Sequence, residues 1–583
     1  MPDRQRIQLV LLAIFAVAGM LLVLFGPAFL DRFSLNVLTR SMIYAMLAIT
    51  VDLLWGYTGI LTFGQAAFFG AGAYATAMVL THIGASPALF ALAFAAAILV
   101  PLLLGLAVGW LSFYQGSTPL YATVISLVVP IVVTQLIYSG GVWTGSSSGL
   151  VGYQTLPLGL PGFFRLTGLC LVALAVLAFV FVRSDAGRLL KAIRDNEARV
   201  AYLGLSPSRV KIALTAALAG VAGLAGFLYA NASGVVAPEN TGFVFGTEMV
   251  VWTALGGRGT IIGPLLGAIG IDYLSANLSG ELPFLWQLIV GALFVVMIIL
   301  LPGGLASLVA RHFRDTAAKQ ALEALPATVN ISAGGADTLV SIRNLGKSYG
   351  SLAVLKGIDL KIRPGELVSV VGPNGAGKTT LMRCLSDGTE AIDGQVESNG
   401  HDIAGMPPER IVALGVGRKF QVASIFDSMT VAECLRMARL SHERPSLTRS
   451  GTSIPLPVAA VEILRLTGIA DIVDRPVSLL SHGQRQALEL AMVVALEPRL
   501  ILLDEPTAGL TKAERMTIGT VLKKLTSEMG FAAILVEHDL DFVREISSRI
   551  VVLHQGKLVL DGTVEDVVQS ETVRTIYAGG AHV

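Results

Sequence analysis

Residues 366–381 read ELVSVVGPNGAGKTTL, and this stretch decides the fold of the second half of the chain. The apolar run 366–371 predicts a short buried strand, and the residues from Leu381 onward predict a helix. The glycine-rich turn between them lets successive backbone N–H groups and the positive end of the helix approach a phosphate. A strand, a glycine turn and a helix in this order predict a phosphate-binding P-loop.

The candidate nucleotide-binding residues are the nine members of this turn. Lys378 supplies a positive charge to the phosphates, and the Thr379 hydroxyl is a predicted ligand of Mg²⁺. We therefore expect ATP and Mg²⁺ to bind here, through Gly372, Pro373, Asn374, Gly375, Ala376, Gly377, Lys378, Thr379 and Thr380.

Two further apolar runs end in residues suited to phosphate chemistry. The run 500–503 leads into Asp504 and Glu505, and the run 533–536 leads into Glu537 and His538. In a parallel sheet both ends lie beside the P-loop. Asp504 is predicted to hold Mg²⁺ through water, and Glu505 to polarise the water that attacks the γ-phosphate.

The first half of the chain has a different composition. The 583 residues are 54% hydrophobic, and only 23 of the 83 charged residues lie within residues 1–302. The mean hydropathy of +0.70 is too high for an ordinary soluble enzyme. A formal net charge of +1 also argues against a nucleic-acid partner, which requires a concentrated basic face.

Apolar stretches long enough to cross a lipid bilayer as helices succeed one another up to residue 301. A shorter run, Gly246 to Leu255, forms either a tenth crossing or part of a re-entrant hairpin that ends near Leu278. An even number of crossings places both chain ends in the cytosol, so eight and ten helices are both allowed. The longer segments lie near 7–30, 34–56, 59–82, 87–111, 118–139, 162–182, 211–230, 261–278 and 284–301.

Basic residues predict which loops face the cytosol. Arg4 and Arg6 precede the first helix, and seven Lys and Arg residues crowd the loop 183–211. Five apolar residues of this loop recur at helical spacing, which predicts an amphipathic helix. It is either a solvated connection or a helix that docks on a cytosolic ATPase; the stripe comprises Leu189, Leu190, Ile193, Val200 and Leu203.

Other features of the apolar half have two interpretations. The small residues of the stretch 59–73 permit close helix packing, or a glycine-broken helix that lines a substrate path. Asp52, Glu248 and Asp272 lie in or beside apolar runs, where carboxylates are costly. Each is either functional or paired with a helix end or with interfacial water.

Together, residues 339–579 resemble the nucleotide-binding domain of an ABC transporter. The resemblance implies that Tyr349 stacks on adenine, that Gln421 senses Mg²⁺ and the membrane domain, and that His538 is the switch histidine. The predicted catalytic residues are therefore Glu505, His538 and Gln421. The resemblance also implies that the signature 480–484 closes on ATP held by the opposite subunit, through Ser481, Gly483 and Gln484.

Two positions of this chain depart from the nucleotide-binding-domain pattern. His482 replaces the first glycine of the signature, and Thr511 stands where many relatives carry aspartate. Because of His482, the geometry of the signature is expected to differ from the family pattern. Because of Thr511, the family's signalling between the paired domains through this loop is not assumed for this chain.

Residues 1–302 resemble permeases of the hydrophobic amino-acid and amide uptake family. The resemblance rests on short sequence motifs around Trp55, Gly64, Gly187, Arg194 and Gly256. It implies import of branched-chain amino acids with a periplasmic binding protein, in a family whose permease and ATPase are usually separate chains. Urea or a short amide is the alternative substrate, and an exporter half-transporter is the alternative of another class.

We therefore predict a multi-span helical permease domain over 1–302, a linker over 303–338 and an α/β P-loop ATP-binding domain over 339–583. The expected location is the bacterial inner membrane, with the ATPase domain in the cytoplasm. The expected partners are a second permease and ATPase, as a copy or as related subunits, together with the lipid bilayer and a small-molecule substrate.

Overall fold

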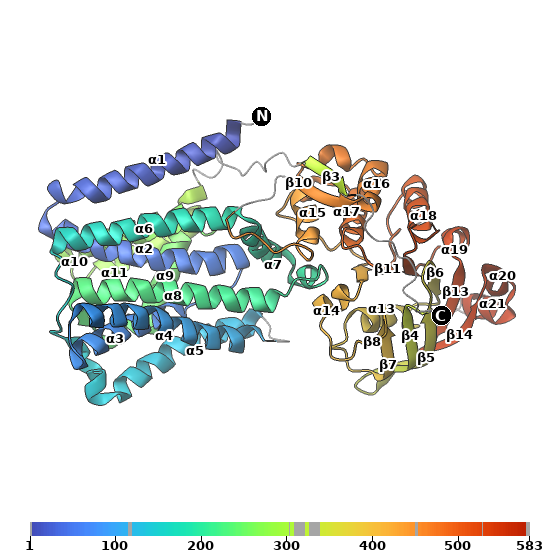
Figure 1. The fold of residues 1–583 in the computed structure, drawn as a ribbon, viewed down its shortest axis with the longest axis horizontal. Helices are drawn as coiled ribbons and strands as arrows, with labels where there is room; N and C mark the ends of the chain where they lie inside the picture. The colour runs from blue at the N-terminus through green and yellow to red at the C-terminus, as the bar shows by residue number, and fades with distance from the viewer. Residues whose placement is uncertain are drawn as a thin grey trace. The chain divides into compact units, whose positions relative to one another are not determined.

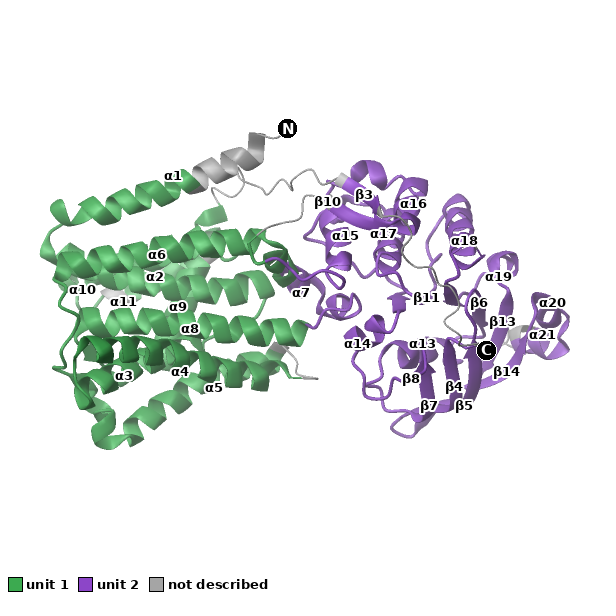
Figure 2. Cartoon of the chain, viewed as in Figure 1, with its two compact units in different colours: residues 1–190, 207–316, 447–449 green, residues 191–206, 317–446, 450–583 purple. Residues whose placement is uncertain are grey.

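The computed structural model describes residues 3–114, 119–301, 303–307, 321–325, 338–448, 453–527 and 529–578. The chain divides into two compact units, which Figure 2 distinguishes by colour. The first consists of residues 1–190, 207–316 and 447–449, and the second of residues 191–206, 317–446 and 450–583. Each unit has a hydrophobic core of its own.

The first unit is built from helices, as its long apolar segments predict (Figure 1). Helix α8 packs against α2, α3 and α4, and α10 packs against α2 and α9. The helices are α1 (Asp3–Phe25), α2 (Arg32–Thr58), α3 (Gln65–His82), α4 (Pro87–Phe113), α5 (Pro119–Ser139), α6 (Leu160–Arg183), α8 (Pro207–Ser233), α9 (Phe243–Gly256), α10 (Ile262–Glu281) and α11 (Trp286–Leu300).

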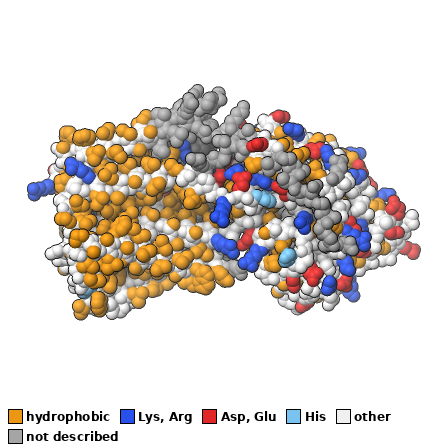
Figure 3. All heavy atoms as spheres, viewed as in Figure 1, with side chains coloured by type: hydrophobic (Ala, Val, Ile, Leu, Met, Phe, Trp, Pro, Cys, Tyr) orange, Lys and Arg blue, Asp and Glu red, His pale blue; other side chains and the backbone are white. Residues whose placement is uncertain are grey.

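The membrane character of this unit follows from the length and apolarity of its helices. Within the described residues, five helices are long and apolar enough to cross a membrane: α2, most of α5, and α4, α6 and α8. Hydrophobic side chains cover the visible face of this unit in Figure 3. The helical architecture predicted for this half of the chain is thus confirmed.

The segment expected to be helical from residue 59 begins its helix only at Gln65. Gly59 ends α2 with a φ of 78°, a left-handed conformation that glycine adopts without steric cost. Further along, the glycines serve close packing. A Cβ at Gly70 would lie 1.9 Å from Thr241 Cγ2, and one at Gly72 would lie 2.6 Å from the Gly223 backbone.

Asp52 has a structural role, since it pairs with the backbone at a helix end. Its carboxylate accepts hydrogen bonds from Gly259 N at 2.5 Å and Ile261 N at 3.1 Å, in the turn between α9 and α10. A Cβ on Gly56 would lie 2.5 Å from Gly259 N, so the backbones meet closely. The sequence motifs around Trp55 and Gly256, two of those that carry the permease resemblance, therefore pack against each other.

The second unit contains a six-stranded sheet in the order β14-β13-β6-β12-β11-β9. Its strands are parallel except for β14, which pairs antiparallel with β13. The strands are β6 (Leu367–Val371), β9 (Val416–Lys419), β11 (Leu500–Asp504), β12 (Ala532–Val536), β13 (Arg549–His554) and β14 (Lys557–Gly562). The inner strands β6, β11 and β12 are fully buried, which explains their unbroken apolar runs.

A four-stranded antiparallel sheet, β5-β4-β7-β8, and a two-stranded parallel pair are the other sheets described in the second unit. They are β4 (Val340–Tyr349), β5 (Leu352–Ile362), β7 (Asp393–Ser398) and β8 (His401–Asp402), with β3 (Ala321–Leu325) beside β10 (Ser453–Pro457). Strand β3 lies in the segment predicted as a linker. The rest of that segment, apart from residues 303–307 and 338, lies outside the described residues.

Helices alternate with the strands of the second unit along the chain. They are α13 (Lys378–Ser386), α14 (Pro408–Ala413), α15 (Val431–Arg439), α16 (Val458–Leu466), α17 (His482–Val494), α18 (Lys512–Ser527), α19 (Leu540–Ile546), α20 (Val564–Gln569) and α21 (Glu571–Ala578). Helix α7 (Asp185–Ala201) begins in the first unit, and from Lys191 to Ser206 the chain belongs to the second.

Candidate active site

The P-loop has the predicted order of strand, turn and helix. It joins β6 to α13, and Gly372, Gly375 and Gly377 adopt φ values of 151°, 78° and 102°. A Cβ at Gly372 would lie 2.1 Å from Leu553 O, so a side chain does not fit there. The turn therefore needs glycine both for its conformation and for the close approach of backbones.

Lys378 is folded back over this turn. Its Nζ donates to Gly372 O at 2.6 Å and to Pro373 O at 3.1 Å. Burial lowers the pKa of Lys378, while Glu505 and Asp504 oppose the shift. Thr379 follows in the first turn of α13 and is exposed. A cationic ammonium, a hydroxyl and a helix N-terminus thus converge where the loop is expected to bind phosphates.

Strands β11 and β12 bring the two carboxylates to the same edge of the sheet. In the parallel register Asp504 pairs with Val536, and Val536 pairs with Val370 next to the P-loop. Asp504 is 2% exposed, and burial raises its pKa. Within the described residues its Oδ1 has no hydrogen-bond partner, so it fits an oxygen ligand sphere such as that of Mg²⁺.

Glu505 is the point where three loops meet. Gln421 Nε2, which follows β9, donates to Glu505 Oε2 at 2.8 Å. His538 Nε2, which follows β12, lies 2.8 Å from Glu505 Oε1. Glu505 itself has a φ of 44°, a strained conformation for a residue with a side chain. The three predicted catalytic residues are brought together.

Glu537 is a residue of this site whose role was not predicted from the sequence. Its buried carboxylate accepts from Thr507 N at 3.0 Å and Thr507 Oγ1 at 2.5 Å through one oxygen, and from His538 N at 3.2 Å through the other. It therefore ties the loop after Glu505 to His538. The signal was present, because an acidic residue directly after a buried strand is costly unless it is paired.

Tyr349, the predicted adenine contact, ends β4 and is 43% exposed. The Lys347 ammonium lies 4.9 Å from its ring centre, and Arg383 Nη1 donates to its hydroxyl at 3.5 Å. Its exposed ring area is compatible with stacking on a planar base.

The signature residues lie at the start of another helix, α17. Ser481 Oγ accepts from Gln484 N at 3.2 Å, and Gln484 Oε1 accepts from Ser481 N at 3.1 Å, which forms a capping box. No hydrogen bond between described residues joins them to residues 372–380. A Cβ on Gly483 would lie 2.3 Å from Glu514 Oε1, which accounts for glycine at that position.

The two departures from the ABC pattern belong to one network. His482 Nε2 lies 3.1 Å from Ala508 O, so the imidazole links the signature to the loop that precedes α18. Thr511 N and Oγ1 donate to Glu514 Oε2 at 2.9 and 2.8 Å. Glu514 also interacts electrostatically with His482, and its pKa is lowered mainly by its hydrogen bonds with Thr511.

The amphipathic loop segment docks on the ATP-binding fold, as one of its two interpretations predicts. Asn196, at a break in α7, donates to Ser424 Oγ at 2.9 Å, and Asp195 Oδ2 accepts from Ser428 N at 2.8 Å. The Tyr202 ring meets the Phe420 ring edge-on, with centroids 4.9 Å apart. These contacts flank Gln421.

A completely buried charged cluster, which the sequence did not reveal, lies under this contact. Arg199 and Glu489 are both 0% exposed at their side chains. Arg199 Nη1 donates to Arg418 O at 3.0 Å and lies 3.4 Å from Glu489 Oε1. Glu489 Oε1 also accepts from Phe420 N at 3.1 Å, and Lys419 Nζ lies 3.9 Å from its other oxygen.

Comparisons with known proteins bear on both halves. Residues 33–298 match the family model of the permease component of branched-chain amino acid transport systems, and residues 355–508 match the ABC transporter model. The ATP-binding protein BraF of a Pseudomonas aeruginosa branched-chain amino acid system is 33% identical over 253 residues, which are 42% of this chain and 98% of BraF. The chain belongs to the branched-chain amino acid transport family of ABC transporters.

Two other relatives complete the comparison of this ABC transporter. The hypophosphite import ATP-binding protein HtxD of Stutzerimonas stutzeri is 34% identical over 42% of this chain and 74% of HtxD. The solved ADP conformation of MJ1267, an ATP-binding cassette, is 26% identical, with a TM-score of 0.36 over 42% of this chain and 99% of that one. The transporter is an ATP-hydrolysing membrane protein with permease and cassette in one chain.

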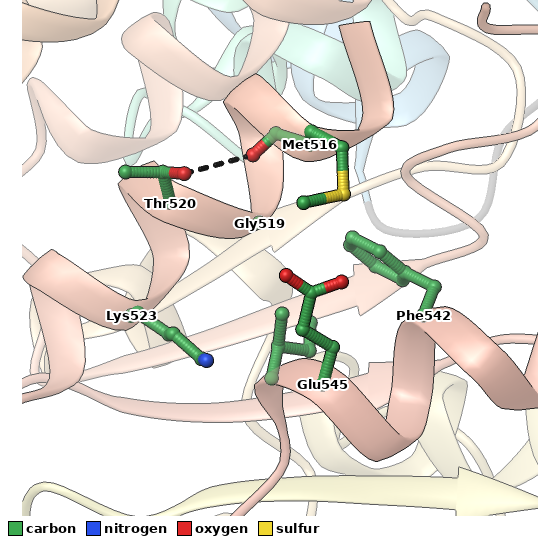
Figure 4. A pocket seen from close by; sticks show the side chains of 7 residues that line it. Met516, Gly519, Thr520, Lys523, Phe542 and Glu545 are labelled. Atoms are coloured by element: carbon green, nitrogen blue, oxygen red, sulfur yellow. Dashed lines mark hydrogen bonds between the residues drawn. The ribbon is translucent and has the colours of Figure 1, made fainter. Parts of the chain in front are cut away.

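A cavity of about 120 Å³ lies in the cassette between α18 and α19 (Figure 4). None of its lining residues belongs to the site around Glu505. They are Met516, Gly519, Thr520, Lys523, Phe542, Glu545 and Ile546.

Proposed function

We propose that this chain drives the import of branched-chain amino acids across a bacterial inner membrane, with a periplasmic binding protein that delivers the substrate. The permease match over residues 33–298 carries the proposal, because it concerns the half through which a substrate passes. The cassette alone does not choose the substrate, since BraF and HtxD are about equally similar to it and are named for different substrates.

In the proposed arrangement, residues 1–302 are the permease domain, 303–338 the linker and 339–583 the cytoplasmic ATP-binding domain. A second permease and a second cassette complete the transporter, as a copy of this chain or as related subunits. Ser481, Gly483 and Gln484 of one cassette then contact the ATP bound to the P-loop of the other.

The roles proposed for the catalytic residues follow from their contacts. Glu505 polarises the attacking water, and Gln421 and His538 hold its carboxylate in place. Each carboxylate oxygen can accept a second hydrogen bond, so both contacts are compatible with a bound water.

Other residues hold the nucleotide and the metal. Lys378 and the loop N–H groups bind the phosphates, and Tyr349 stacks on adenine. Mg²⁺, which neutralises phosphate charge, would be held by Thr379, by Asp504 through water and by Gln421.

In the proposed transport cycle, the docked segment 191–206 transmits motion between the ATP-binding domain and the permease domain. It contacts the chain on both sides of Gln421, through Phe420 and Ser424. A shift of the Gln421 loop on ATP binding therefore moves α7, which continues directly into the helical unit. Hydrolysis at Glu505 resets the arrangement.

Uptake by proteoliposomes tests the proposal. The intact transporter is reconstituted with candidate binding proteins, and ATP-dependent uptake of leucine, isoleucine and valine is compared with that of urea and acetamide. We expect leucine uptake and ATP hydrolysis to rise with the loaded binding protein, and both to vanish in Glu505→Gln.

Three results would contradict the proposal. Uptake of urea or acetamide alone would identify an amide importer. ATP hydrolysis stimulated by substrate without a binding protein would identify an exporter. Hydrolysis that responds to neither would indicate an ATPase without transport.

A further inference from the structure

Three charged residues from different helices of the first unit gather at one place. Arg40 lies in α2, Glu248 in α9 and Asp272 in α10. Arg40 Nη2 lies 3.0 Å from Asp272 Oδ1, and Arg40 Nε donates to Asp272 Oδ2 at 3.3 Å. Glu248 interacts electrostatically with both of them.

Asp272 is the inner member of the group. It is buried, and it also accepts a hydrogen bond from Ser41 Oγ at 2.6 Å. The bidentate pair with Arg40 and this hydroxyl fix its carboxylate. Asp272 therefore orients the Arg40 guanidinium.

The outer members are accessible from outside the chain. The Arg40 side chain is 43% exposed, and Glu248 is exposed. Asp272 is the eleventh of the twenty residues of α10, so the group lies about 15 Å from either end of that helix. Charged side chains within the apolar part of a membrane protein face water or protein rather than lipid, so we expect the same of this group.

A rigid aromatic cluster lies directly behind the charges. Tyr44, one turn after Arg40, stacks on Trp252, one turn after Glu248, with ring centroids 5.3 Å apart. The rings of Tyr229 and Phe245 pack on Tyr44 as well. These contacts pack α2 against α9, so the turns that carry Arg40 and Glu248 lie on adjoining helices.

We propose that Arg40, Glu248 and Asp272 form the polar face along which a zwitterionic α-amino acid crosses the permease. Glu248 pairs with the substrate ammonium, and Arg40, positioned by Asp272, pairs with its carboxylate. This inference rests on the proposed transport function and deepens it. A neutral amide carries no charge that could pair with Glu248 or Arg40. A zwitterionic substrate pairs with both, which explains why two charged residues are kept in an apolar unit despite the free-energy cost.

Thiol labelling tests whether the face meets water. Glu248→Cys is made in a Cys170→Ala background, because Cys170 is the one of the three cysteines that is not buried. The matched control is Leu177→Cys on α6, whose side chain is 66% exposed on an apolar helix. We expect a charged methanethiosulfonate to modify the cysteine at 248 at least about tenfold faster than that at 177.

Transport tests whether the face meets the substrate. Leucine uptake per ATP hydrolysed by the reconstituted transporter is compared for Glu248→Gln, Glu248→Asp and the neighbouring control Thr247→Val. We expect at least about a tenfold loss in Glu248→Gln, recovery in Glu248→Asp and no change in Thr247→Val.

Two results would overturn the inference while leaving the transport function intact. One is a cysteine at 248 that labels as slowly as that at 177, as expected if a second permease covers the group. The other is wild-type leucine uptake per ATP in Glu248→Gln. Absence of leucine uptake by the wild-type protein would instead refute the proposed function.

Discussion

At the residue scale, Glu505 combines a strained backbone with two hydrogen bonds from separate loops. Its φ of 44° is maintained because Gln421 and His538 hold its side chain and Val536 O accepts its N–H at 2.9 Å. Strain retained by surrounding contacts is common at catalytic positions. The residue is placed by its neighbours rather than by its own conformational preference.

Replacing Glu505 with Gln removes the negative charge that a general base needs while keeping its size. We expect phosphate release to fall by roughly 100-fold or more, with ATP binding retained. Phosphate release and binding of a fluorescent ATP analogue measure the two effects. Glu545→Gln, an exposed carboxylate in the cavity of Figure 4, is the matched control, and wild-type hydrolysis by Glu505→Gln would exclude Glu505 as the base.

Asp504 leads to a prediction about pH and stability. Burial raises its pKa, so its charged form is disfavoured in the folded protein relative to the unfolded chain. The associated stabilisation is present at low pH and is lost as pH rises through the raised pKa. Asp504→Asn is neutral at every pH and should therefore raise the melting temperature of the nucleotide-free transporter at pH 7.

The same substitution should weaken the metal site. We expect Mg²⁺ affinity in the presence of ATP to fall roughly 10- to 100-fold. In the wild type, Mg²⁺-dependent binding should also weaken as the pH falls toward the raised pKa. Thermal unfolding with and without MgATP measures both effects, and a lower melting temperature of the nucleotide-free variant would contradict the assignment.

At the element scale, the starts of α17 and α18 are held together by His482 and Thr511, the two residues that depart from the usual ABC pattern. His482 reaches Ala508 O, and Thr511 caps α18 through Glu514. The imidazole therefore supplies a contact that glycine at position 482 would lack. The signature and the loop before α18 form one connected piece.

We expect His482→Gly to destabilise the cassette by about 1 kcal/mol or somewhat more, because it removes a hydrogen bond and places glycine in the first turn of α17. His482→Gln, which retains a donor, should be closer to wild type. Denaturant unfolding of the full chain, followed by fluorescence, compares the two variants. Equal stability of His482→Gly and wild type would show that the Ala508 contact contributes nothing.

The buried cluster joins α7 to α17 and to the segment before Gln421. Removing Arg199 alone leaves the buried Glu489 with one ion-pair partner among the residues that the structure describes, Lys419 at 3.9 Å. We expect Arg199→Leu to cost about 3–5 kcal/mol, and the double change with Glu489→Leu to recover much of that loss. A double-mutant cycle on unfolding, with uptake per ATP measured in parallel, tests this; additive costs would exclude direct coupling.

Much of the cassette could be predicted from sequence because its signals are local. The run 366–371 followed by glycines predicts one local structure, a strand that leads into a P-loop. Asp504 and Glu505 follow another strand, which parallel pairing places beside it. The contacts of Asp52 with Gly259 and of Arg40 with Asp272 join residues more than 200 positions apart. Neither pair leaves a periodic pattern in the sequence, so they become visible only in the folded chain.

At the scale of the whole molecule, the signature and the P-loop are expected to meet across two chains. If a copy of this chain is the partner, a mixture of Glu505→Gln and Ser481→Arg chains forms dimers with one intact site. We expect each variant alone to be inactive and the coexpressed mixture to recover about a quarter of wild-type hydrolysis. No recovery from purified mixed dimers would indicate a different partner subunit.

The docked segment 191–206 also has a consequence for how the transporter is assembled. Because the cassette and the segment that docks on it are covalently continuous, docking is an intramolecular event with a high effective concentration. A weak docking surface then suffices, and a foreign cassette competes poorly for it. In cells that make many related transporters, each cassette would in this way stay paired with its own permease domain.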